Sequence, residues 1–276
     1  MGEMCRILVW GGFWCLLWSG TASGQFTSSP QTRPGLGAQT WFHGWYTRIT
    51  SHNGEDVVGI LTASLFDLDP QDCLDHTGGY VAIMRRNRVT GRLDVYESFP
   101  PSTRVVLGNA LAGKQAEKVG YHWEADGIGF ANEDEVHIQL HDGISFTACF
   151  HNRQAWDPKH PRRGPEGLAE YLALLQAHWS VYSVASETSF RLADSTGEFI
   201  GKGVAHQETN WGQAFPKAFV WAQGCSPDGQ ASFVLAGGKL PLGAGNLQGW
   251  LAGLRTPDVA WDFRPQVPGT VFSTQI

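Results

Sequence analysis

The sequence predicts an all-β protein made of antiparallel strands. Three observations lead to this fold class. The 276 residues include 34 glycines and 12 tryptophans, only 17% of them are charged, and short apolar segments alternate with turn sequences. A polar residue followed by glycine favours a tight hairpin. Such pairs recur as Asn53-Gly54, Thr90-Gly91, Asp126-Gly127 and Asp142-Gly143.

Residues 1–24 predict a signal peptide. Arg6 lies in a short N-terminal region, residues 7–18 are apolar apart from glycines, and residues 19–24 are small and polar. About a dozen apolar residues are too few for a membrane-spanning helix but suit a signal sequence. We therefore expect a protein of the secretory-pathway lumen or a secreted one, with no stable membrane span after cleavage. An uncleaved signal anchor is the alternative.

The next segments predict a lead-in and a first β half. Residues 25–40 are rich in Ser, Thr, Pro and Gly, which is typical of a flexible segment. Residues 41–155 form the predicted first half. Within it, residues 136–140 alternate between apolar and polar, as expected for a half-buried strand. The expected strands cover 57–65, 80–84, 93–99, 136–140 and 144–150.

A linker and a second β half follow. Residues 156–179 contain three dipeptides that end in proline: Asp157-Pro158, His160-Pro161 and Gly164-Pro165. Within this linker, residues 170–178 have the spacing of one short amphipathic helix. Residues 180–276 form the predicted second half, an antiparallel barrel or sandwich like the first. Its expected strands cover 180–184, 189–193, 199–206, 219–223 and 232–236.

Charge and cysteine content exclude several classes of protein. A net charge of −6 argues against nucleic-acid binding, which needs a basic surface. The sequence has no Gly-x-Ser-x-Gly motif, which argues against a serine hydrolase. His137 and His141 would lie about 13 Å apart in a strand, too far to share a metal ion. Signal cleavage would leave Cys73, Cys149 and Cys225, which allow at most one disulfide of undetermined pairing.

Two segments concentrate aromatic and polar residues. The first is Phe42-His43-Gly44-Trp45-Tyr46, where a glycine between bulky rings allows close approach of another backbone or a ligand. The second is residues 206–216, His-Gln-Glu-Thr-Asn-Trp-Gly-Gln-Ala-Phe-Pro, followed by the aromatic strand 219–223. A buried Glu208 beside an indole would have a raised pKa and could donate a proton. We expect both segments to converge on a dry chamber lined by indoles.

These segments resemble the tocopherol cyclase-like family, which includes carotenoid hydratase-like and fungal Diels–Alderase-like proteins. The family has an early F-x-G-W-Y, a later E-K-N-W-G-x-x-F-P, and then W-x-W-x-Q. The order is the same here and the similarity spans most of the mature chain. Thr209 replaces the usual lysine, and His43 replaces the acid that usually precedes Gly-Trp-Tyr. Relatives continue beyond the part that matches 261–262, so we expect either a shortened second half or an incomplete sequence.

The resemblance implies two lipocalin-like halves around an apolar cavity. It also implies cyclisation of a prenylated quinol or related isoprenoid to a chromanol, by protonation of an alkene and attack of the phenol oxygen. Neither a metal nor an organic cofactor is required. Glu208 would be the proton donor or the group that orients it. Indole walls would stabilise the cation and two polar groups would hold the quinol: Trp45, Trp211 and Trp221 for the walls, Tyr46 and Asn210 for the head.

Other interpretations of the same residues remain. The tryptophans can simply fill a β core. Glu208 can accept backbone N–H groups of the turn at 212–216, which would lower its pKa. The protein can also be a non-catalytic carrier of a lipid, terpenoid or quinone. Fold alone does not separate these functions.

Overall fold

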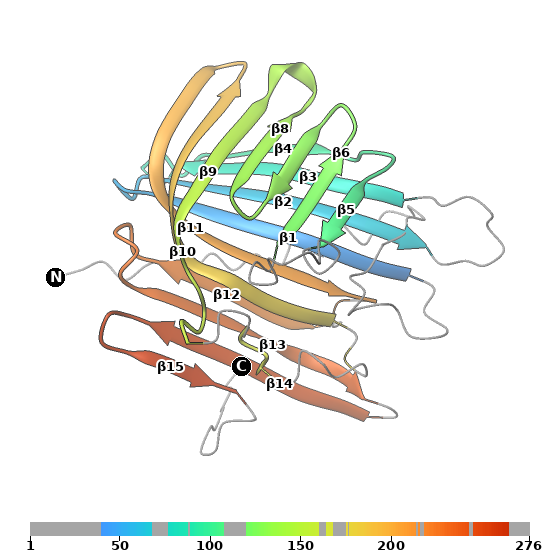
Figure 1. Ribbon diagram of the computed structural model, residues 1–276, viewed down its shortest axis with the longest axis vertical. Helices are drawn as coiled ribbons and strands as arrows, with labels where there is room; N and C mark the ends of the chain where they lie inside the picture. Colours follow the sequence, from blue (N-terminus) through green and yellow to red (C-terminus); the bar gives the residue numbers. More distant parts are fainter. Residues whose placement is uncertain are drawn as a thin grey trace, which may run out of the picture.

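The computed structural model describes residues 40–67, 77–87, 89–107, 120–159, 164–167, 175, 177–213, 215, 218–242 and 245–264. The predicted signal peptide, most of the lead-in and Cys73 lie outside these ranges. The described chain is almost entirely β-strand, arranged as two antiparallel sheets (Figure 1). The predicted all-β fold class of antiparallel strands is therefore confirmed.

The larger sheet has eleven strands in the order β4-β3-β2-β1-β11-β10-β9-β8-β7-β6-β5. It curls into a half-barrel, so that β6, β8 and β9 cross over β1, β2 and β3 (Figure 1). The strands are β1 (Thr40–Ser51), β2 (Asp56–Asp67), β3 (Thr77–Asn87), β4 (Leu93–Ser98), β5 (Arg104–Leu107), β6 (Tyr121–Ala125), β7 (Gly129–Asn132), β8 (Glu135–Gln139), β9 (Ser145–Gln154), β10 (Ala177–Asp194) and β11 (Gly197–Gly212).

The smaller sheet has four strands in sequence order. They are β12 (Phe219–Cys225), β13 (Ser232–Leu242), β14 (Gly245–Arg255) and β15 (Ala260–Phe263). This sheet packs against the side of β1, β10 and β11 that faces away from the half-barrel interior, as the contacts described below show. The 3-10 turn His141–Gly143 joins β8 to β9.

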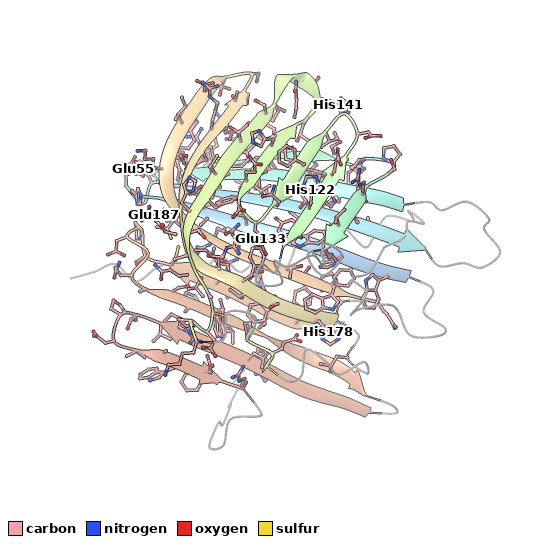
Figure 2. The ribbon with its side chains drawn as sticks, viewed as in Figure 1. Glu55, His122, Glu133, His141, His178 and Glu187 are labelled. Carbon is pink, nitrogen blue, oxygen red and sulfur yellow. The ribbon has the colours of Figure 1, made fainter. Side chains whose placement is uncertain are left out.

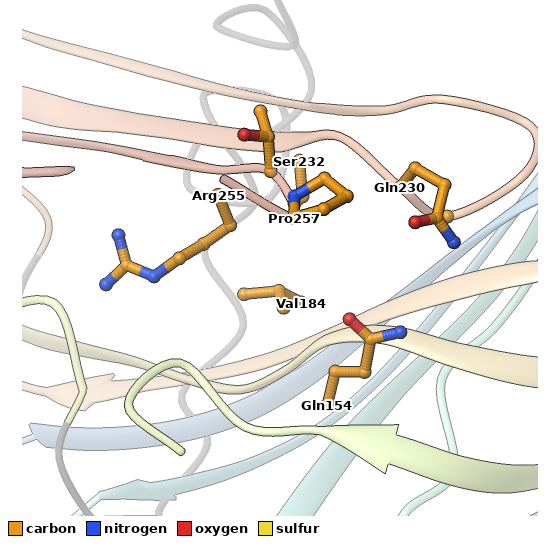
Figure 3. A pocket seen from close by; sticks show the side chains of 8 residues that line it. Gln154, Val184, Gln230, Ser232, Arg255 and Pro257 are labelled. Carbon is orange, nitrogen blue, oxygen red and sulfur yellow. The ribbon is translucent and has the colours of Figure 1, made fainter. Parts of the chain in front are cut away.

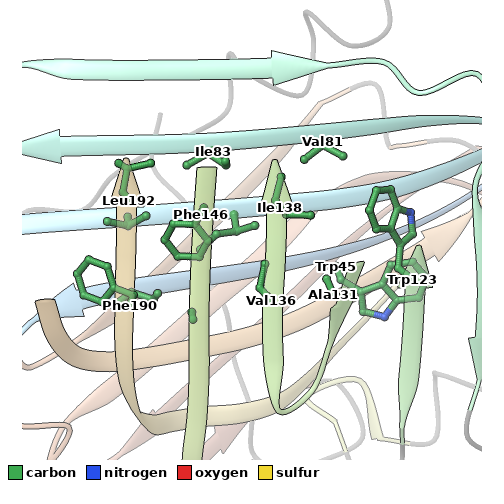
Figure 4. Close-up of a cluster of buried hydrophobic side chains, with 14 of the residues drawn as sticks. Trp45, Val81, Ile83, Trp123, Ala131, Val136, Ile138, Phe146, Phe190 and Leu192 are labelled. Atoms are coloured by element: carbon green, nitrogen blue, oxygen red, sulfur yellow. The ribbon is translucent and has the colours of Figure 1, made fainter. Parts of the chain in front are cut away.

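The main hydrophobic core fills the half-barrel (Figure 4). Val81 and Ile83 of β3 lie across from Phe146 of β9 and Leu192 of β10, and all four are almost completely buried. Full burial of such a side chain contributes about 1.5–3 kcal/mol. The indole N–H of Trp123 donates to Ser64 Oγ over 3.1 Å, so this ring is buried without losing its hydrogen bond.

Local sequence signals are confirmed. Val136 and Ile138 are buried whereas His137 and Gln139 are exposed, which is the predicted alternation of β8. Glycines of all four predicted turns have a left-handed backbone: Gly54 (φ 71°), Gly91 (φ 73°), Gly127 (φ 70°) and Gly143 (φ 77°). Left-handed φ values carry little cost for glycine, which explains why these hairpins turn where they do.

The sheets divide the chain at a different place from the predicted halves. Strand β10 begins at the end of the predicted linker, 156–179, and β11 comes after it. Both nevertheless belong to the larger sheet, where β10 pairs with β9 and β11 pairs with β1. The boundary between the sheets therefore falls between residues 212 and 219. The reason is long-range pairing: β11 closes the gap between β1 and β10, and sequence spacing does not reveal that partner.

The helix predicted at 170–178 lies mostly outside the described residues. Its last two residues, Ala177 and His178, belong to β10 and pair with Gly212 and Trp211 of β11, so the helix prediction is wrong there. Strand pairing supplies their backbone hydrogen bonds and overrides the helical spacing. Cys149 is exposed and Cys225 is buried, and both are free thiols. The described residues contain no helix long and apolar enough to cross a bilayer.

Candidate functional site

The two aromatic segments lie side by side as neighbouring strands. Residues 42–46 belong to β1 and residues 208–212 to β11, and the strands pair in antiparallel register. Tyr46 lies opposite Glu208, and Trp45 lies opposite Thr209. The expected convergence of the two segments is therefore present at the level of the backbone.

Alternation along the strands then separates the candidate side chains. Residues directly opposite each other share a face of the sheet, and adjacent residues point to opposite faces. Tyr46 and Glu208 point toward the smaller sheet, where Trp221 of β12 lies edge-on to Tyr46 with 5.3 Å between ring centroids. Trp45 and Trp211 point into the half-barrel. The six predicted site residues therefore do not form one group.

We use the name inter-sheet layer for the side chains between β1, β11 and β12: Tyr46, Arg48, His206, Glu208, Asn210, Trp221 and Gln223. Two hydrogen-bonded pairs organise it. His206 Nε2 lies 3.1 Å from Glu208 Oε2, and Arg48 Nε donates to Gln223 Oε1 over 3.1 Å. Exposed fractions are 6% for Arg48, 0% for His206, 1% for Glu208 and 5% for Gln223. Four polar side chains, two of them of charged type, are thus enclosed between the sheets.

Burial also sets the protonation of two neighbours. It lowers the pKa of His206; the hydrogen bond to Glu208 opposes this lowering, and the positive charge of Arg48 adds to it. Burial raises the pKa of the Tyr46 phenol well above its usual value, with Arg48 opposing the rise and Glu208 adding to it. Both rings are therefore uncharged near neutral pH.

Several buried polar atoms of the inter-sheet layer have no hydrogen-bond partner within the described part of the chain. An unmet buried polar atom costs about 1–3 kcal/mol, so folded proteins rarely keep such atoms together. Such atoms can form hydrogen bonds with a bound molecule or with water. These atoms are Arg48 Nη2, Glu208 Oε1, Asn210 Oδ1, Trp221 Nε1 and Gln223 Nε2.

Apolar side chains surround this polar group on both sides. The larger sheet contributes one cluster, formed by Tyr46, Leu61, Tyr80, Ala82 and Met84, and Trp221 packs against it. A second cluster, which Trp221 also touches, consists of Trp156, Trp179, Val181, Val184 and Val234. A ligand with a polar head and an apolar remainder fits such surroundings.

Sequence reasoning missed Arg48, and it included His206 in the second aromatic segment without giving it a role in the site. A signal for both was present, because each lies two residues from a predicted site residue in the same strand. Arg48 follows Tyr46 and His206 precedes Glu208, so strand alternation places all four on one face. Within the described residues Glu208 accepts no hydrogen bond from the turn at 212–216; its Oε2 is paired with His206.

The opposite face of the same strands carries a second aromatic group. His43 stacks on Trp45 with ring centroids 4.1 Å apart, and His43 Nε2 lies 3.0 Å from Thr209 Oγ1. Thr209 Oγ1 donates its own hydrogen to Gly44 O over 2.8 Å, so His43 Nε2 is the donor to Thr209. Burial lowers the pKa of His43 to about 3. This imidazole is neutral, and its Nδ1 is an acceptor without a described partner.

Glu166 and His178 form a further buried pair that the sequence did not indicate. His178 Nδ1 lies 3.1 Å from Glu166 Oε2, and the Trp179 amide donates to Glu166 Oε1 over 2.8 Å. Burial raises the pKa of Glu166, while the bonds from His178 and Trp179 oppose that rise. The His178 ring stacks on Trp211 at 5.4 Å. Glu166 lies in the proline-rich linker, where nothing local marks it as a partner of β10.

A pocket of about 150 Å³ opens at another place, near the β12–β13 and β14–β15 turns (Figure 3). It contains none of the predicted site residues. Arg255 lines it, but each nitrogen of its guanidinium already has a partner: Nε donates to Trp156 O, Nη1 to Leu254 O and Trp261 O, and Nη2 to Asp262. The Arg255 guanidinium thus serves to link β14 to β15.

No group of three metal-ligating side chains occurs among the described residues. His122 lies in β6 and His141 in the turn between β8 and β9, whereas His178 lies at the start of β10 (Figure 2). His137 is hydrogen-bonded to Glu135 at 3.1 Å.

Comparison with known proteins shows similarity of fold. No protein-family profile matches the chain, and no curated protein matches it. Among solved structures, CghA has 11% sequence identity and a TM-score of 0.51, covering 85% of this chain and 66% of CghA. The structure of CghA with Sch210972 has 10% sequence identity and a TM-score of 0.50, covering 85% of this chain and 64% of that structure's chain. Kievitone hydratase from Nectria haematococca has 12% sequence identity and a TM-score of 0.47, covering 88% of this chain and 71% of the hydratase.

The chain thus spans about two thirds of the length of CghA. At this identity the similarity to CghA shows a shared fold. The more specific resemblance to the tocopherol cyclase-like family stays a prediction.

Proposed function

We propose that the inter-sheet layer is the active site of an enzyme that transforms an isoprenoid or a related apolar molecule by proton transfer. The observation that carries the proposal is the environment of Glu208. Its carboxyl group is almost completely buried, one oxygen is paired with His206, and the other has no described partner. Tyr46 and Trp221 place aromatic rings in the same layer. The solved neighbours, a hydratase among them, supply the fold for such a site.

The reaction we propose is cyclisation of a prenylated quinol to a chromanol. Glu208 in its protonated form gives its proton to the alkene, and a tertiary carbocation results. The phenol oxygen attacks this cation and forms the new C–O bond, and the proton that the phenol loses over the cycle replaces the one that Glu208 gave to the alkene. Product and substrate then have the same atoms, so no cofactor takes part. Exclusion of water protects the cation, and indole faces stabilise it.

Residue roles follow the faces of the sheet. For a ligand held in the inter-sheet layer, Trp221 is the nearest indole wall, and Trp156 and Trp179 belong to the cluster that it touches. Asn210 and Tyr46 remain candidates for the polar head. Trp45 and Trp211 point into the half-barrel, where a ligand of this layer does not contact them.

The second candidate is a carrier that holds a lipid, terpenoid or quinone in the same layer without changing it. The bond between His206 and Glu208 favours this alternative, because a carboxylate fixed in that way can serve binding alone.

Incubation with a prenylated benzoquinol in D₂O tests the proposal. An enzyme of this kind releases a chromanol with one deuterium at the protonated carbon, detected by mass spectrometry. Glu208→Gln should lower turnover at least about 100-fold, the scale of general acid catalysis, and leave binding intact. Glu198→Gln is the matched control, since Glu198 is an exposed residue of the same strand.

Full activity of the Glu208→Gln protein would refute the acid role. Binding of the quinol without any chromanol would establish the carrier instead. A protein that neither binds nor converts such ligands would overturn both functions.

A further inference from the structure

The hydrogen bond between Arg48 and Gln223 fixes the orientation of the Gln223 amide. A guanidinium has only donors, so the group that faces Arg48 Nε must be the amide oxygen. The NH₂ end of Gln223 therefore keeps both of its hydrogens for other acceptors.

Two donors remain unused on this linked pair. Arg48 Nη2 and Gln223 Nε2 are buried and have no acceptor within the described residues. Arg48 also forms no ion pair there, although only 6% of it is exposed. A buried cation with an unfilled donor is costly unless an oxygen with negative charge or a strong dipole binds to it. The pair therefore has two donors available for a ligand oxygen.

The position of Glu208 adds a proton acceptor beside this donor pair. Arg48 lies opposite His206 and Tyr46 lies opposite Glu208, so Arg48 and Glu208 are diagonal neighbours on one face of the sheet. Such neighbours are within reach of long side chains. The charge of a Glu208 carboxylate balances that of Arg48, which leaves the layer neutral before a ligand binds.

Building on the proposed function, we infer that the substrate carries a weakly acidic hydroxyl, a phenol or an enol, whose oxygen binds to Arg48 Nη2–H and Gln223 Nε2–H. Its O–H bond breaks and the proton passes to Glu208 Oε1, where a new O–H bond forms. The oxyanion stays paired with Arg48. One proton transfer thus produces both the acid that protonates the alkene and the oxyanion nucleophile that closes the ring. Net charge is unchanged, and no other reactant is needed.

Three matched probes test this inference: a 4-alkylphenol, its methyl ether and the corresponding alkylbenzene. We expect the phenol to bind at least about tenfold more tightly than the other two in calorimetric titrations. Binding should also produce the ultraviolet difference band of a phenolate. Equal affinity for phenol and ether, or absence of the band, would overturn the inference.

Variants separate this inference from the proposed function. Gln223→Glu removes the donor and places a carboxylate beside Arg48, so it should weaken phenol binding at least about tenfold and leave alkylbenzene binding unchanged. Gln139→Glu, on the exposed side of β8, is the matched control. Thermal unfolding confirms that each variant is folded. In Glu208→Gln the phenol should bind without the phenolate band.

The two claims fail in different ways. A phenolate band without conversion of a prenylated quinol would support the inference and refute the cyclase. Conversion that is equally fast in the wild-type and Gln223→Glu proteins would support the proposed function and refute the role of the Arg48–Gln223 pair.

Discussion

His43 and His206 are buried histidines on opposite faces of one strand pair. His43 lies in β1 and turns into the half-barrel, whereas His206 lies in β11 and turns toward β12. Burial lowers the pKa of both. Protonation of either would place a charge where water does not reach, so the folded state favours the neutral rings.

We expect this to make stability dependent on pH. Below about pH 6.5 the unfolded chain binds protons that the buried rings do not, so the free energy of unfolding falls as the pH drops. For His43 the fall continues down to about pH 3, where the folded state also binds the proton. The slope approaches about 1.4 kcal/mol per pH unit for each such ring.

His43→Gln should reduce that slope, because an amide can keep the bond to Thr209 but does not titrate. Urea unfolding at a series of pH values between about 4 and 7 measures the slope of the free energy of unfolding. This range includes the unperturbed histidine pKa of about 6.5. His137→Gln, at an exposed position of β8, is the control. An identical slope in the wild-type and His43→Gln proteins would contradict this account.

Individual site residues could be identified from the sequence only where they lie in a segment with a distinctive composition. Glu208 and Trp221 stand in aromatic segments that attract notice. Arg48 stands among ordinary strand residues, and its importance comes from Gln223, which is 175 positions away. Glu166 meets His178 across a linker that has no regular pattern. Contacts between distant segments decide these roles, and one sequence does not contain them.

Pairing of β1 with β11 is the element that creates the candidate site. It requires close approach at Gly203, where a Cβ would collide with the backbone carbonyl of Thr50. Gly44 is different. A Cβ there would lie 3.3 Å from Asn210 Oδ1 and 3.6 Å from the Ala63 Cβ, so neighbouring side chains alone would adjust.

Gly203→Ala should therefore destabilise the protein by about 1–3 kcal/mol, the usual cost of overpacking against groups that cannot move. Gly44→Ala, the matched control in the partner strand, should change stability by less than about 1 kcal/mol. Chemical denaturation of both variants measures the difference. Equal stabilities would show that β1 and β11 are free to separate.

At the scale of elements, the turns were predictable and the long-range pairing was not. Gly54 and Gly127 mark hairpins by their own chemistry, since each needs a left-handed backbone. The partner of β1 on its other side is about 160 residues further along the chain, and the hydrophobic pattern of β11 suits several neighbours. The division into halves therefore missed that β10 and β11 complete the larger sheet.

The whole molecule consists of a strongly buried half-barrel and a less buried second sheet. Three contacts between β1 and β12 join them in matching order: Tyr46 with Trp221, Arg48 with Gln223, and Thr50 with Cys225. Among the described side chains of the smaller sheet, most are half-buried. Sheets with fewer buried contacts open at lower free energy.

Hydrogen–deuterium exchange should therefore be faster in β13 than in β1 or β2. Trp221→Ala should raise the exchange of β12 and β13 about tenfold, equivalent to about 1.4 kcal/mol, and leave β6 to β9 unchanged. Trp261→Ala, at an exposed position of the same sheet, is the control. A uniform increase over both sheets would mean that the molecule opens only as a single unit.

Strand β10 contains two irregular points of pairing with β11, between Val181 and Ser183 and between Ser183 and Ser186. Each one accommodates a single surplus residue on β10 while the flanking residues stay in register. An insertion or deletion of one residue here changes the number of bulges and leaves Trp179 and Phe190 facing the same neighbours. Among homologues, gaps in this sheet should therefore gather at positions 182–185, in the middle of a buried strand, where length variation is otherwise rare.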